Sequence, residues 1–98
     1  MINKESLLPL LRTRLKKMGP GEGIDIRSYK RNRSVVIIRV SEMRFKVIER
    51  GFFVEEFEVE ERGLEKLLKK VIKREFPRSH KLRLYHISGE ELLPYKRL

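Results

Sequence analysis

The chain has 98 residues, with 24 Lys and Arg against 14 Asp and Glu, which gives a formal net charge of +10 at pH 7. It contains no cysteine, which excludes disulfides, thiolate catalysis and cysteine-based metal sites. The length predicts a single small domain over residues 1–98, and no apolar run approaches the roughly 20 residues that a membrane-spanning helix needs.

The charge has two features, abundance and imbalance. Charged residues make up 39% of the chain and glutamine is absent, a composition typical of proteins from hot environments. A high content of charged residues does not by itself explain the excess of cations over anions, and such an excess attracts polyanions.

Because Glu5 and Arg12 interrupt the apolar residues near the N-terminus, no signal peptide is predicted and the expected location is the cytoplasm.

The first predicted element is a helix that begins at Ser6, whose hydroxyl could cap the first turn. Leu8, Leu11 and Leu15 recur at helical spacing, and Gly19-Pro20-Gly21 ends the pattern.

Four short strands are predicted next, at residues 24–27, 34–40, 44–49 and 52–60. The run Val35–Ile38 is apolar at every position, which is typical of a strand buried on both faces. In the fourth strand, Phe53 and Phe57 are expected to pack in the core. The connections between these strands are short, which favours an antiparallel meander.

A second helix is predicted from about Glu61 to Phe76, where Pro77 stops it. A last strand is predicted over residues 82–87, followed by a C-terminal tail at 88–98. The predicted order is α-β-β-β-β-α-β. We therefore expect an α+β fold, in which a four-stranded, mostly antiparallel meander gains a fifth strand and two helices cover one face of the sheet.

Catalytic chemistry has little support in the sequence. His80 and His86 have no nearby aspartate, and His86 shares an alternation with Leu82 and Leu84 that indicates a half-buried packing residue. Asp25 is the only aspartate and is expected to be structural or at the surface. A metal-dependent nuclease would need a second carboxylate on the strand after Asp25, and Ile37-Ile38-Arg39 supplies none. We predict no enzyme activity, no cofactor and no metal.

Cations gather around the first predicted hairpin, with a tyrosine among them that could stack on a base. The predicted nucleic-acid-binding residues there are Arg27, Tyr29, Lys30, Arg31, Arg33 and Arg39. The first helix would extend this surface with Arg12, Lys16 and Lys17 if it packs alongside. A further basic cluster, near the end of the second helix, comprises Lys73, Arg74, Arg78, Lys81 and Arg83.

These residues predict a small basic protein that binds nucleic acid through phosphates with low sequence specificity, RNA more readily than DNA. No membrane partner is expected. The alternative is a protein-interaction module or a subunit of a homodimer or larger homo-oligomer, which would use the acidic strand at 52–61 or the tail at 88–98.

Overall fold

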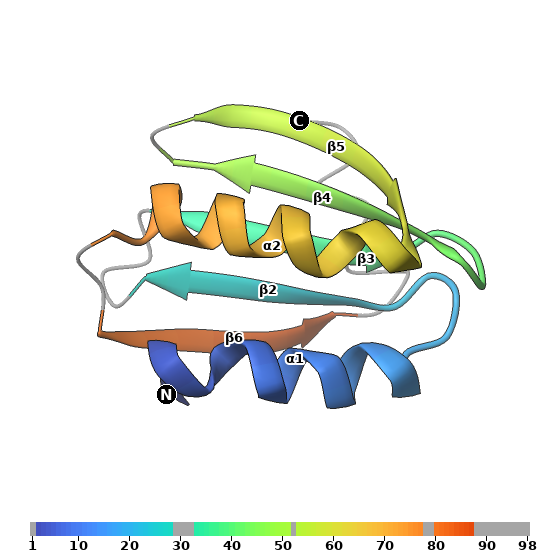
Figure 1. The fold of residues 1–98 in the computed structure, drawn as a ribbon, viewed down its shortest axis with the longest axis horizontal. Coiled ribbons are helices and arrows are strands. Elements are labelled where there is room, and N and C mark those ends of the chain that lie inside the picture. Colours follow the sequence, from blue (N-terminus) through green and yellow to red (C-terminus); the bar gives the residue numbers. More distant parts are fainter. Residues whose placement is uncertain (1, 29–32, 52, 78–79, 88–98) are drawn as a thin grey trace.

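A computed structural model describes residues 2–28, 33–51, 53–77 and 80–87 of the chain. In this part of the chain, two helices lie on one face of an antiparallel sheet (Figure 1). The sheet has the strand order β1-β6-β2-β3-β4-β5. The elements are β1 (Ile2–Asn3), α1 (Lys4–Lys17), β2 (Gly23–Ser28), β3 (Ser34–Arg39), β4 (Arg44–Arg50), β5 (Val54–Glu60), α2 (Glu61–Glu75) and β6 (Lys81–Ile87).

The predicted α+β class is confirmed, but the number of strands differs. The described residues form six strands where five were predicted, because the short β1 pairs with β6 through Ile2 and Leu82. The first helix consequently begins at Lys4, directly after this pairing, and Ser6 lies inside it. The sequence did not indicate which edge of the sheet the last strand joins; β6 pairs with β2, since α2 carries the chain back across the sheet from the edge strand β5.

The core lies between the helices and the sheet. Val35 and Ile37 of β3 and Phe45 and Val47 of β4 are buried on the helix side. Leucines from both helices close over them, namely Leu7, Leu11, Leu15, Leu64 and Leu68. This packing explains the register, because a shift of one residue would turn the apolar side chains away from the helices.

The opposite face of the sheet, which we call the open face because neither helix covers it, carries a smaller apolar cluster. Val36 and Ile38 of β3 are buried there with Ile87 of β6. The prediction that Val35–Ile38 is buried on both faces is therefore confirmed.

Phe53 departs from its prediction. It precedes β5, and 44% of its surface is exposed, with the Arg74 guanidinium 4.5 Å from the ring centroid. Phe57 packs partly buried against the core, as predicted. The apolar contact expected for Phe53 is replaced by this cation–π contact with α2.

Candidate nucleic-acid interface

A row of arginines crosses the open face. The strand register places Arg83 of β6 opposite Arg27 of β2, Arg27 opposite Ser34 of β3, and Ser34 opposite Arg50 of β4. Directly opposed residues project from the same face, so the three guanidiniums share one side of the sheet. We call Arg83, Arg27 and Arg50 the arginine row. With neighbouring strands about 4.8 Å apart, the row spans roughly 14 Å.

Arg27 and Arg83 lie on the open face because they alternate with core residues, and Arg50 shares that face because it is directly opposite Ser34. Ile26 precedes Arg27 and belongs to the core under the helices, and Leu82 and Leu84 flank Arg83 in the same way. Successive residues of a strand point to opposite faces, so the arginines point away from the helices.

Asp25 holds Arg27 in place. The Asp25 carboxylate is buried and accepts a hydrogen bond from Arg27 Nε at 2.8 Å. The Arg27 side chain remains 35% exposed, and its guanidinium lies 5.6 Å from the centroid of the Tyr85 ring. Asp25 thus has a structural role, which is to orient a cation of the row.

Tyr85 is an aromatic side chain of the interface that the sequence reasoning missed. Tyr85 is directly opposite Asp25 in the register and lies two residues after Arg83 on β6. Of its surface, 37% is exposed. A partly exposed tyrosine beside arginines offers a ring on which an unpaired base can stack. The sequence did contain a signal for this position: Tyr85 follows Arg83 by two residues in a strand, so the two side chains are expected on the same face.

Of the predicted hairpin residues, only Arg27 is placed on the row. Tyr29, Lys30 and Arg31 lie outside the described residues. The residues that flank this segment are hydrogen-bonded to each other, since Ser28 N donates to Arg33 O at 3.1 Å. Arg33 belongs to the helix side of the sheet, where its Nη1 donates to the Glu75 carbonyl at 3.3 Å.

Arg39 is buried and does not belong to a phosphate-binding surface. Its guanidinium donates to the Leu15 carbonyl at 2.7 Å and to the Glu42 carbonyl, and lies 4.5 Å from the centroid of the Phe45 ring. These contacts tie the end of β3 to α1. The interpretation of Arg39 as a phosphate ligand therefore conflicts with its burial.

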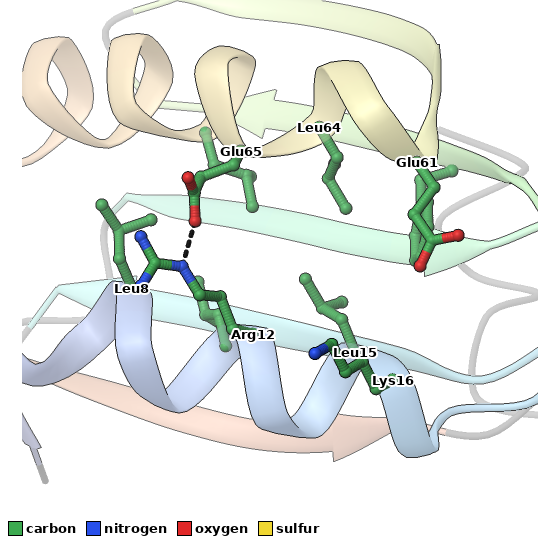
Figure 2. A pocket seen from close by; sticks show the side chains of 10 residues that line it. Leu8, Arg12, Leu15, Lys16, Glu61, Leu64 and Glu65 are labelled. Carbon is green, nitrogen blue, oxygen red and sulfur yellow. Dashed lines mark hydrogen bonds and ion pairs between the residues drawn. The ribbon is translucent and has the colours of Figure 1, made fainter.

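The cations of α1 lie on the helix side of the sheet, away from the arginine row. Arg12 points toward α2 and donates to Glu65, and Lys16 follows one turn later (Figure 2). Lys17 is exposed near the end of the same helix. Arg12, Lys16 and Lys17 therefore do not extend the surface to which Arg27 belongs, because the sheet lies between them and Arg27.

The Arg12–Glu65 contact changes the acidity of the carboxylate. Its hydrogen bond from Arg12 holds the pKa of Glu65 below the ordinary value. A carboxylate with a lowered pKa in the folded state adds stability above its unfolded pKa, and this contribution disappears as the pH falls through the lowered value. Both side chains are about half exposed, so the contribution is small.

Away from the arginine row, the cations that β4 carries on the open face are paired with acidic residues of β5. Toward the β5 edge, Lys46 Nζ lies 2.7 Å from Glu56 and Arg44 Nε lies 3.6 Å from Glu58. These pairs neutralise the cations of β4 nearest the acidic strand. The face therefore changes from basic at the arginine row to balanced at β5.

The described residues contain no cluster of three or more His, Asp or Glu that could hold a metal ion. His86 is more exposed than predicted, with 54% of its side chain accessible and Nε2 3.6 Å from Glu22. Within the described ranges, neither helix is long and apolar enough to cross a membrane.

The fold and the interface define an α+β protein with both helices on one face of an antiparallel sheet and an arginine row on the other. Searches against protein-family models, curated proteins and solved structures found no match to this chain.

Proposed function

We propose that the protein binds nucleic acid, with RNA favoured over DNA, and that the arginine row supplies the phosphate contacts. The observation that carries this proposal is the register of β6, β2, β3 and β4, which aligns Arg83, Arg27 and Arg50 on the open face. Guanidinium groups bind phosphate through paired N–H donors, and a net charge of +10 draws a polyanion toward the molecule.

Low sequence specificity and a preference for RNA follow from the kind of surface. Phosphate contacts fix a nucleic acid in position but do not read its bases. Tyr85 adds a stacking surface beside Arg27, which suits single strands whose bases are unpaired. Both helices pack their apolar faces on the sheet, so neither is placed as a recognition helix for the major groove of DNA, and this is the ground for favouring RNA.

The double variant Arg50→Gln/Arg83→Gln tests this proposal. Two lost phosphate contacts should make the log–log salt dependence of single-stranded RNA binding shallower by about 1.4 and weaken binding roughly tenfold to thirtyfold at 0.1 M salt. Fluorescence anisotropy of a labelled oligonucleotide across a salt series measures both quantities. The matched control is Lys69→Gln/Lys70→Gln, which removes the same charge from two exposed positions of α2.

Arg27 and Arg33 are left unchanged in this variant because both make contacts that support the fold. Arg27 neutralises the buried Asp25, and Arg33 donates to the last turn of α2, so replacing either would disturb the fold as well as the surface. The proposal fails if the control weakens binding as much as the Arg50/Arg83 variant does, because the salt dependence would then report net charge alone.

A protein-interaction module is the second candidate, and the exposed edge of the sheet favours it. Val54 begins the edge strand β5 with 81% of its surface accessible, next to the exposed Phe53. A partner strand could add to this edge through main-chain hydrogen bonds. Sedimentation of the protein alone tests self-association through this edge: a dimer would favour the second candidate, whereas a monomer would exclude a homo-oligomer formed by β5.

A further inference from the structure

A hollow lies between the two helices, on the side of the molecule opposite the arginine row. Its volume is about 240 Å³, and Phe45, a fully buried residue of β4, lies at its base on the sheet side. The apolar side chains that line it come from both helices and are Leu8, Leu11, Leu15, Leu64 and Leu68. We call this hollow the interhelical groove.

The mouth of the groove carries cations on one helix and carboxylates on the other. Arg12 and Glu65 join across it near Leu8 and close that end. Lys16 of α1 and Glu61 of α2 line the groove one turn further along, near Leu15 and Leu64. Both are exposed, and among the described residues neither side chain has an ion-pair partner. One end of the mouth is therefore closed by an ion pair, while the other presents opposite charges on its two sides.

We propose that the interhelical groove binds a small zwitterion with an apolar body, the chemical class of the hydrophobic α-amino acids. The ligand carboxylate would lie toward Lys16 and its ammonium toward Glu61, while its side chain enters between Leu15 and Leu64 above Phe45. An apolar cavity of about 150 Å³ accommodates benzene, so the larger groove has room for a leucine or phenylalanine side chain. This inference is independent of nucleic-acid binding, because the groove and the arginine row are on opposite faces of the sheet.

The charge pattern at the mouth separates this ligand class from others. A simple fatty acid could pair with Lys16 but would leave Glu61 without a counter-charge, and an apolar amine could pair with Glu61 but would leave Lys16 without one. A molecule with both charges at one end satisfies both helices. Because Lys16 and Glu61 are exposed, each contributes modestly, and we expect a dissociation constant on the order of 1 mM.

A matched ligand series tests the assignment by NMR of the full chain. L-leucine and L-phenylalanine should shift the methyl signals of Leu15 and Leu64 and the ring signals of Phe45. Three probes each lack one feature of leucine: 4-methylpentanoic acid lacks the ammonium, 3-methylbutylamine lacks the carboxylate, and glycine lacks the body. Each should bind at least about threefold more weakly than leucine, since every missing feature removes one contact.

Single variants then test the orientation. Lys16→Gln and Glu61→Gln should each weaken leucine binding about two- to fivefold. Lys17→Gln and Glu5→Gln are the controls, because both are exposed residues of α1 outside the groove lining, and they should leave the affinity unchanged. Equal binding of 4-methylpentanoic acid and leucine, equal loss in variants and controls, or the absence of shifts at 20-fold the expected dissociation constant would each overturn the proposal.

Discussion

Replacing Phe45 with alanine is expected to lower the free energy of unfolding by about 3–5 kcal/mol, a large part of the 5–15 kcal/mol that holds a small domain together. The Phe45 side chain is fully buried at the base of the interhelical groove, with the Arg39 guanidinium 4.5 Å from its ring centroid. Its removal would extend the groove into the core and leave Arg39 without its stacking partner. Both losses follow from one substitution because Phe45 lines the groove between the helices and also stacks on Arg39.

Urea unfolding followed by circular dichroism measures this effect as a shift in the transition midpoint. Met43→Ala is a suitable control, because that side chain is 62% exposed and its truncation should change stability by no more than about 0.5 kcal/mol. Equal midpoints for Phe45→Ala and the control would show that the residues of the two helices do not close over Phe45 as described.

Replacing Arg74 with methionine is expected to have the second large effect. Glu49 is fully buried, and its two carboxylate oxygens lie 3.1 and 3.0 Å from Arg74 Nε. Arg74 Nη2 also donates to Glu55 at 3.2 Å. The hydrogen bond with Glu49 is the main reason that the pKa of Arg74 is raised above its usual range. Without Arg74, the Glu49 carboxylate would be buried with no counter-charge, so the melting temperature should fall by more than about 10 °C.

The double variant Arg74→Met/Glu49→Leu distinguishes the loss of a counter-charge from a simple loss of packing. Removing both members of a buried pair leaves no uncompensated charge, so the double variant should be more stable than Arg74→Met alone. Differential scanning calorimetry of the wild type, both single variants and the double variant gives the comparison. A double variant that is less stable than Arg74→Met would show that the carboxylate does not depend on Arg74.

The elements with strong periodicity could be predicted from the sequence. The apolar run Val35–Ile38 indicated a central strand, and the stripe of leucines from Leu64 indicated the second helix. The two-residue strand Ile2–Asn3 was missed because two residues cannot show an alternation. Its existence depends on Leu82, which is distant in the sequence.

The interface was predicted less well, because successive residues of a strand point to opposite faces of the sheet and cations that are close in sequence therefore lie on different faces. Arg27 faces away from the helices, whereas Arg33 donates to the end of α2. Arg39 follows Ile37 by two residues, and this spacing could have indicated that it shares the buried helix side. Arg83 joins Arg27 only because β6 pairs with β2, and no local pattern reveals that pairing.

Binding of labelled single- and double-stranded RNA and DNA to the wild-type protein across a salt series tests the central claim most directly. The arginine row predicts a linear fall of log affinity with log salt, at least as steep as about −1.4 for single-stranded RNA, and tighter binding of RNA than of DNA. A slope near zero, or no binding to any of the four ligands at 0.1 M salt, would contradict nucleic-acid binding by this protein.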